Sequence, residues 1–130
     1  MTAVRLGSGA PWEAVVGYSR VVASADAAWV SGTTATVDGV VVHPGDAGAQ
    51  TRVALTTVAQ SLADAGFSLE DVVRTRVYVT DISRWQEVGL VHGEFFGGIR
   101  PATTMVQVAA LIDPAHLVEI EADAVRGAGA

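Results

Sequence analysis

The sequence predicts an α+β domain in which two helices cover one face of a single β-sheet. Residues 46–65 repeat apolar side chains at helical spacing, and residues 71–80 alternate apolar and polar side chains as a strand does. Further strand-like segments precede and follow these two, a pattern typical of helices packed on a sheet. A length of 130 residues suffices for one such domain, so we expect a single domain over 1–130 with a short flexible tail at 127–130.

The N-terminal part of the sheet is predicted from apolar runs separated by turn residues. Residues 19–25 and 28–32 are expected to form two strands joined by a turn at Asp26. Residues 37–42 contain an Asp-Gly dipeptide, which favours a tight type I′ hairpin turn. Two or three strands are therefore expected before the first helix.

The first helix is expected over residues 46–65. Asp46 is a suitable N-cap, and Gly66 stands where a glycine commonly ends a helix. The apolar side chains that share one face of this helix are Leu55, Val58, Leu62 and Ala65. We therefore predict a long helix with one buried stripe.

The strand at 71–80 is predicted to have a core face and a polar face. The core face carries Val73, Thr75, Val77 and Val79, and the polar face carries Arg74, Arg76 and Tyr78. Ser83 and Gln86 then have the spacing of a capping box, which predicts a second helix that ends before Pro101. Its expected inner side carries Trp85, Val88, Val91 and Phe95.

Two last strands are expected at 102–109 and 117–125, separated by a turn at Asp113-Pro114. With both helices on one face, the other face of the sheet is predicted to mix apolar and charged groups. Its expected members are Arg76, Tyr78, Thr103, Met105, Gln107, Glu119 and Glu121. Such a face favours an assembly interface that contains a polar pocket.

Composition excludes several classes of function. The chain has no lysine and a net charge of −6, so nucleic acid and anionic membranes are not expected partners. It has no cysteine, which excludes disulfides and thiolate catalysis. Neither a signal-like apolar segment nor a membrane span is visible, so a cytoplasmic location is expected. Half of the residues are apolar, which favours self-association.

Short motifs follow one another along the chain in a characteristic order and spacing. They are Tyr18-Ser19, Trp29-Val30-Ser31-Gly32, Gln50-Thr51-Arg52, Ala65-Gly66, Leu69-Glu70-Asp71-Val72-Val73, Val77-Tyr78-Val79-Thr80-Asp81, Arg100-Pro101-Ala102-Thr103-Thr104 and Leu117-Val118-Glu119-Ile120-Glu121-Ala122. Through them the chain resembles the Rid family, also called YjgF/YER057c/UK114, over roughly residues 10–125.

The resemblance implies a chorismate-mutase-like α+β fold with one mixed β-sheet. It also implies a homotrimer whose sheets form a barrel-like centre, with clefts between neighbouring subunits. The best-known members hydrolyse 2-imino or enamino acids to 2-keto acids and ammonia without a cofactor. The residues that match the family's site are Tyr18 and the Ser31-Gly32 pair, which line the pocket, and Glu119, which would orient the attacking water.

The chain departs from the family's deaminase motif at Thr103, where those members have the arginine that binds the substrate carboxylate. A hydroxyl cannot supply the charged bidentate contact of a guanidinium. Met105, on the same strand, is expected to line the pocket beside Thr103. The family's pocket asparagine corresponds to Gly89 here. The expectation is therefore a C=N hydrolase of altered specificity, and the alternative is a non-catalytic trimer that binds a metabolite in its intersubunit cleft.

Several site candidates have a structural alternative. Glu119 orients a water or forms an interface salt bridge with Arg74 or Arg76. Arg76 replaces the missing cation beside Thr103 or is the buried partner of Glu121. His92 is a proton donor or hydrogen-bond partner in the cleft, or an ordinary, partly exposed helix histidine.

No metal site is expected. The other histidines, His43 and His116, offer no cluster with His92, and His116 is expected at the surface. Ribonuclease activity, which is attached to some members of the family, is disfavoured by the lack of lysine and the acidic charge.

Overall fold

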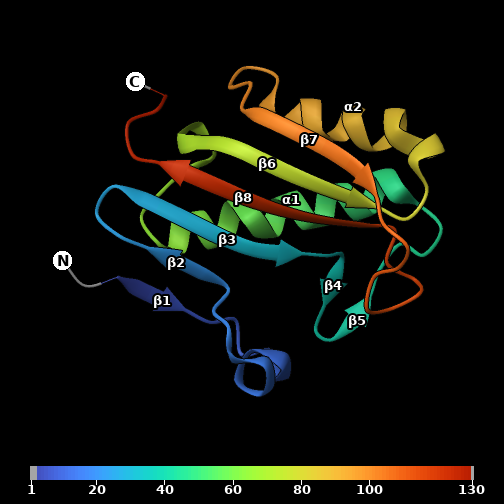
Figure 1. Cartoon of the computed structure of the whole chain (residues 1–130), viewed down its shortest axis with the longest axis horizontal. Helices are drawn as coiled ribbons and strands as arrows, with labels where there is room; N and C mark the ends of the chain where they lie inside the picture. Colours follow the sequence, from blue (N-terminus) through green and yellow to red (C-terminus); the bar gives the residue numbers. More distant parts are fainter. Residues whose placement is uncertain (1–2, 130) are drawn as a thin grey trace.

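The computed structural model describes residues 3–129, and its centre is a six-stranded sheet in the order β1-β2-β3-β8-β6-β7 (Figure 1). The strands are β1 (Val4–Leu6), β2 (Val21–Ala23), β3 (Ala27–Thr33), β6 (Val72–Val79), β7 (Ala102–Gln107) and β8 (Val118–Val125). Strands β6 and β7 are parallel, and all other neighbours are antiparallel. The sheet is therefore mixed.

Helices α1 (Ala47–Asp64) and α2 (Trp85–Phe96) lie on the same face of this sheet (Figure 1). The core between helices and sheet consists mainly of valine, leucine and alanine side chains. Among the described residues no α-helix covers the opposite face, which is called the open face below. The predicted α+β fold with two helices on one face of a mixed sheet is confirmed.

Local sequence signals explain α1. The Asp46 side chain accepts a hydrogen bond from the Ala49 N–H at 2.9 Å, as an N-cap does. Leu55, Val58 and Leu62 are fully buried, as their spacing predicts. Gly66 has a φ of 83°, a left-handed conformation that favours glycine and ends the helix.

A hairpin precedes α1, formed by β4 (Thr36–Val37) and β5 (Val40–Val41). Asp38 and Gly39 between them both have positive φ, at 51° and 78°. Two positive φ values at the central residues are the signature of a type I′ turn. The predicted turn is confirmed.

The start of α2 differs from the prediction. A short 3-10 turn, η3 (Ile82–Arg84), comes first, and the helix begins at Trp85. The Asp81 carboxylate accepts the Ser83 N–H at 3.0 Å, so the cap is Asp81 and the capping box proposed at Ser83 is wrong. Of the residues expected on the inner side of this helix, Trp85 is half-exposed at 53%. The fully buried phenylalanine of α2 is Phe96 and not Phe95.

The face assigned to β7 was also wrong. Its parallel register sets Thr103 beside Thr75 and Met105 beside Val77. Thr75 and Val77 are buried under the helices, so Thr103 and Met105 lie on the helix-covered side of the sheet. Gln107, beside buried Val79, shares that side. The residues of β7 on the open face are Ala102, Thr104 and Val106.

The chain ends were predicted least well. Strand β1 was not expected, and it pairs with β2 at one edge of the sheet. In the tail, residues 127–129 form a turn in which the Gly127 N–H donates to the Asp71 carboxylate at 3.2 Å. Ala130, also part of the predicted tail, lies outside the described residues.

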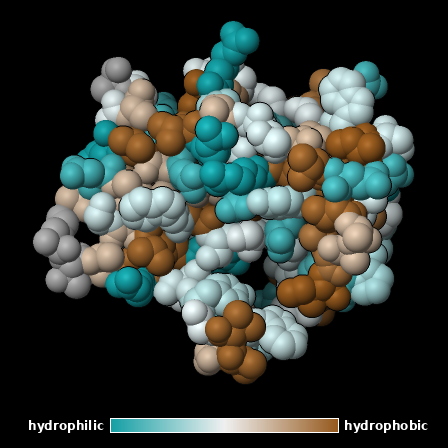
Figure 2. Space-filling model, in the orientation of Figure 1, coloured by the Kyte–Doolittle hydropathy of each residue, from teal (hydrophilic) through white to brown (hydrophobic). Residues whose placement is uncertain are grey.

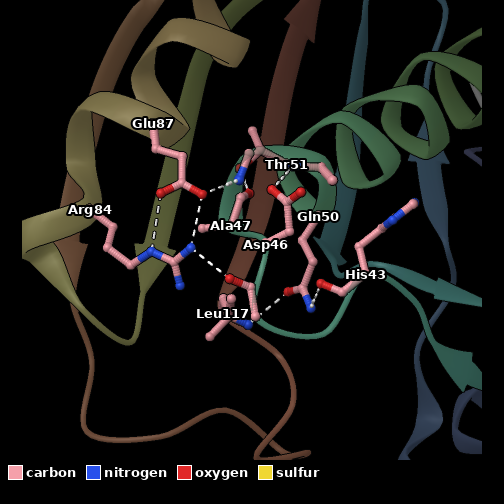
Figure 3. A network of polar contacts seen from close by, with 11 residues as sticks. His43, Asp46, Ala47, Gln50, Thr51, Arg84, Glu87 and Leu117 are labelled. Atoms are coloured by element: carbon pink, nitrogen blue, oxygen red, sulfur yellow. Dashed lines mark hydrogen bonds and ion pairs between the residues drawn. The ribbon is translucent and has the colours of Figure 1, made fainter.

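A polar network joins the start of α1 to the loop that leads into β8 (Figure 3). Gln50 is fully buried, and its amide donates to the Ala115 carbonyl at 2.9 Å and accepts the Leu117 N–H at 2.8 Å. Glu87 of α2 accepts the Gly48 N–H at 3.1 Å. These contacts fix Leu117 and so the start of β8 at Val118, one residue before Glu119.

Candidate functional site

The open face carries a charged network along its centre. Arg76 lies 3.2 Å from the Asp123 carboxylate and 3.8 Å from that of Glu121. Tyr78 donates a hydrogen bond to Glu121, and this bond raises the pKa of the Tyr78 hydroxyl. Figure 2 shows a band of hydrophilic residues across the middle of this face. Arg76 therefore pairs chiefly with Asp123, an acid that the sequence argument had not considered.

Glu119 lies on the open face but stands apart from this network. Within residues 3–129, its carboxylate takes part in no hydrogen bond or ion pair, so the predicted alternative of a salt bridge to Arg74 or Arg76 is not realised in the single subunit. Glu119 rests instead on Gly32: a Cβ added to Gly32 would lie 3.0 Å from the Glu119 carboxyl carbon. The absence of a side chain at Gly32 thus allows the close approach.

A bulge in β3 shapes the backbone under Glu119. The pairing of β3 with β8 shifts register between Val30 and Thr33. Arg20 donates through Nη2 to the carbonyl oxygens of Ser31 and Gly32, at 2.5 and 2.6 Å. The Ser31 hydroxyl donates to the Ser19 carbonyl at 2.6 Å. The guanidinium of Arg20 therefore binds both carbonyl groups of the bulge and stabilises it.

Arg20 is the site residue that sequence reasoning missed. Burial lowers the pKa of its guanidinium, while the nearby acidic groups Glu13, Tyr18 and Glu119 act in the opposite direction. Its Nε is buried without a hydrogen-bond partner among residues 3–129. The sequence does contain one sign of this role, because Arg20 is a single charged residue between the Tyr18-Ser19 motif and an apolar strand.

Tyr18 completes this group. It ends the short helical turn η1 (Glu13–Gly17), where its N–H donates to the Glu13 carbonyl at 3.0 Å. Its side chain is partly exposed. The predicted residues Tyr18, Ser31, Gly32 and Glu119 are thus brought together around Arg20. We call this set the Glu119 half-site.

A second group lies on the helix-covered side, at the edge strand β7. The Thr75 hydroxyl lies 2.8 Å from His92 Nε2 and 2.8 Å from the Thr103 hydroxyl. Burial lowers the pKa of His92. Met105 follows Thr103 on the same side of β7. We call His92, Thr75, Thr103 and Met105 the Thr103 half-site, in which Thr75 is a second residue that sequence reasoning did not single out.

The two half-sites lie on opposite faces of one sheet. Arg76 shares the open face with Glu119, so the predicted placement of Arg76 on the same face as Thr103 is wrong. Within one subunit, Arg76 cannot stand in for a cation beside Thr103.

Two cavities of about 690 and 310 Å³ occur in the described part of the chain. The larger is lined by Arg100, Pro101 and the C-terminal turn, and the smaller by Arg20 and the outer side of α1. Neither is lined by Glu119 or Thr103. These two cavities therefore do not join the half-sites, which lie on opposite faces of the sheet.

The remaining expectations concern metals, membranes and His116. Among residues 3–129, no group of at least three histidine, cysteine or acidic side chains could hold a metal ion. In the same residues no helix combines the length and apolarity needed to cross a membrane. His116 is buried, not at the surface as expected, and its Nε2 lies 3.0 Å from the Thr36 hydroxyl.

Comparisons with known proteins agree with this architecture. The family model described as Endoribonuclease L-PSP matches residues 8–126. The crystal structure of Rv2704 from Mycobacterium tuberculosis, described as a member of the YjgF/YER057c/UK114 family, is similar with a TM-score of 0.87 and 52% identity, and the match covers 95% of this chain and 99% of that one.

Two curated relatives are also similar in sequence. The uncharacterized protein SCO2049 of Streptomyces coelicolor is 40% identical over 124 residues, which cover 95% of this chain and 92% of that protein. The 3-aminoacrylate deaminase RutC of Acinetobacter baylyi is 42% identical over 80 residues, which cover 62% of this chain and 63% of that protein. The chain therefore belongs to the Endoribonuclease L-PSP family, the YjgF/YER057c/UK114 or Rid family that its motifs resemble.

Proposed function

We propose that this protein is a cytoplasmic enzyme that hydrolyses a small imine or enamine to a carbonyl compound and ammonia, in a cleft between subunits of a homotrimer. The observation that carries the proposal is the position of Glu119. Its carboxylate is unpaired among the described residues and rests on the Ser31-Gly32 bulge, where it can hold a water.

The reaction requires few functional groups from the protein. An imine carbon is already electrophilic, and an enamine becomes an iminium ion when its β-carbon is protonated. With the imine nitrogen protonated by solvent, Glu119 takes a proton from the water as the water oxygen bonds to that carbon, which gives a neutral carbinolamine. Glu119 returns this proton to the nitrogen. It then accepts the hydroxyl proton as ammonia leaves and the carbonyl forms, and ammonia carries that proton away as ammonium. Water is the only co-reactant, and the cleft contributes mainly orientation.

The separation of the half-sites supports a cleft built by two subunits. Glu119 and Thr103 cannot face one another across a single sheet, whereas a neighbouring copy can present its own Thr103 half-site to Glu119. The turn η1 and its N-cap residue expose apolar side chains, with Trp12 at 58%, Val15 at 76% and Val16 at 68%. Figure 2 shows this apolar projection at the lower edge of the open face. Exposed apolar groups of this kind favour burial against a partner.

The substrate class follows from the relative and from Thr103. RutC is named for its action on 3-aminoacrylate, an enamine, which supports an enamine or imine as the substrate here. Thr103 offers no positive charge to a carboxylate at its position. We therefore infer that specificity differs from that of members with arginine there.

The test generates 2-iminopropionate or 2-iminobutyrate in situ and follows release of the keto acid. Glu119→Gln keeps the size of the side chain but removes the base, and we expect it to lower the rate by about 100-fold. Glu70→Gln, an exposed acid with no role in either half-site, is the matched control and should keep the wild-type rate. Equal rates for Glu119→Gln and wild type would refute the proposal, as would a monomer by light scattering.

A second function is favoured by the same Thr103 position. Without a cation, the cleft could hold a metabolite and sense it without converting it. Saturable thermal stabilisation by a metabolite recovered unchanged, with no hydrolysis of any imine, supports this function over catalysis. Ribonuclease activity, which the family model's name describes, finds no support in a chain of net charge −6 without lysine.

A further inference from the structure

A chain of hydrogen bonds runs from the core to the exposed side chain of Thr103. Thr75 is fully buried in β6, and its hydroxyl bridges His92 on α2 and Thr103 on β7, at 2.8 Å on each side. Thr103 is on an edge strand and is exposed. The three elements α2, β6 and β7 thus each contribute one group to a continuous path.

The path has no fixed direction. A hydroxyl has a single hydrogen, so Thr75 can donate to His92 or to Thr103 but not to both. If His92 Nε2 carries a hydrogen, Thr75 donates to Thr103, and the Thr103 hydroxyl donates to the Pro101 carbonyl at 3.3 Å or turns its hydrogen outward to a bound group. If Nε2 is unprotonated, Thr103 donates inward and presents its lone pairs outward. The exposed hydroxyl can therefore serve as donor or acceptor as His92 changes tautomer.

The path also carries no charge near neutral pH, because burial lowers the pKa of His92. The cations nearest in the chain do not supply one. Arg74 and Arg76 flank Thr75 and lie on the open face, and Arg76 is paired with Asp123. Arg100 lines the 690 Å³ cavity, which Thr103 does not line. A carboxylate beside the Thr103 hydroxyl would gain no charged donor from the Thr103 half-site, whereas an uncharged group could both give and receive hydrogen bonds.

We propose that Thr103 is the specificity-determining residue of this site, that Thr75 and His92 position its hydroxyl, and that it selects substrates with an uncharged carboxamide-type group in place of a carboxylate. This inference rests on the proposed function for the place where the substrate sits. Thr75 and His92 act through Thr103 and are positioning residues.

Pyruvamide and pyruvate are suitable probes, because they differ only in this group and resemble the carbonyl product. The quantity measured is the ratio of their dissociation constants, by calorimetry on the assembled protein. Wild type should prefer pyruvamide. Thr103→Val, which keeps the shape but removes the hydroxyl, should reduce that preference about fivefold, the worth of a neutral hydrogen bond. Thr103→Arg should reverse it, with pyruvate binding at least tenfold tighter than in wild type.

The positioning residues are tested by matched pairs. Thr75→Ser keeps the bridging hydroxyl and should keep the preference, whereas Thr75→Val should lose it. His92→Gln keeps a polar partner for Thr75 and should retain most of the preference, whereas His92→Leu should not. General loosening of the fold weakens both probes alike, so the ratio separates positioning from stability.

Three results overturn the inference: wild type binds pyruvate as tightly as pyruvamide, the ratio is insensitive to Thr103→Val and Thr75→Val, or neither probe binds any variant. Its failure is distinct from failure of the hydrolase proposal. A Thr103-dependent preference in a protein that hydrolyses no imine supports the specificity site and refutes the enzyme. Hydrolysis that depends on Glu119 with an unchanged ratio does the reverse.

Discussion

The contact between Glu119 and Gly32 makes Gly32→Ala a decisive substitution. The added Cβ would lie 3.0 Å from the Glu119 carboxyl carbon and 3.2 Å from one carboxylate oxygen. Ordinary carbon–carbon contacts are about 3.5–4.0 Å, so the carboxyl group must move by about 0.5–1 Å. A displacement near 1 Å of a catalytic group costs on the order of 100-fold in rate. We therefore expect kcat/KM to fall between about 10-fold and 100-fold, or about 1.4–2.7 kcal/mol of transition-state stabilisation.

The same change should leave the fold intact. Gly32 is exposed and is not among the glycines with positive φ, so alanine fits its backbone. The unfolded chain loses freedom with alanine, so the free energy of unfolding should stay equal or rise by up to about 1 kcal/mol. The assay is keto-acid release with the imine generated in situ, together with urea unfolding.

Gly93→Ala is the matched control. A Cβ there meets nothing within 4 Å, and its place in α2 predicts about 1 kcal/mol of added stability with unchanged activity. If Gly32→Ala keeps both the stability and the rate of the wild type, then Glu119 does not orient the water from its place on Gly32.

Three further substitutions test the framework. Gln50→Leu leaves the Leu117 N–H without its buried partner. It should lower the free energy of unfolding, measured in urea, by about 2–4 kcal/mol. A loss within about 0.5 kcal/mol, the size of an ordinary surface change, would contradict this role. Arg20→Met frees the two carbonyls of the Ser31-Gly32 bulge and should cost about 1–3 kcal/mol as well as activity, with Arg20→Lys intermediate; unchanged activity would argue against the bulge as part of the site. The folded pKa of His92 lies below its ordinary 6.5, so the unfolded chain takes up the proton first and stability falls as pH drops below 6.5 through the folded value. Thermal unfolding from about pH 8 to pH 5 should therefore show a steeper decline for wild type than for His92→Gln, and parallel curves would exclude His92 as the cause.

Local signals made α1 predictable. The cap at Asp46, the apolar repeat and Gly66 all lie within the segment that they define, so no knowledge of distant contacts was needed. The Asp38-Gly39 turn was predictable for the same reason. The family motifs, read in order, likewise indicated the fold, and with it the set of Tyr18, Ser31, Gly32 and Glu119.

What the sequence could not supply depends on contacts between distant segments. Strand β7 reads Ala-Thr-Thr-Met-Val-Gln, which has no clear alternation, and only its parallel pairing with β6 decides that Thr103 faces the helices. The partners of Arg20 are backbone carbonyls in a bulge, which no residue pattern announces. His116 was assigned to the surface because its partner, Thr36, lies 80 residues away.

The placement of the half-sites on opposite faces has a genetic consequence. Under the proposed assembly, no cleft belongs to one polypeptide, so a lesion at Glu119 and a lesion at Thr103 damage different walls of each cleft. Co-expression of two such defective alleles would produce mixed oligomers in which an intact wall from one allele meets an intact wall from the other. Partial rescue between alleles would then arise without recombination, as it cannot in an enzyme whose catalytic groups all come from one chain.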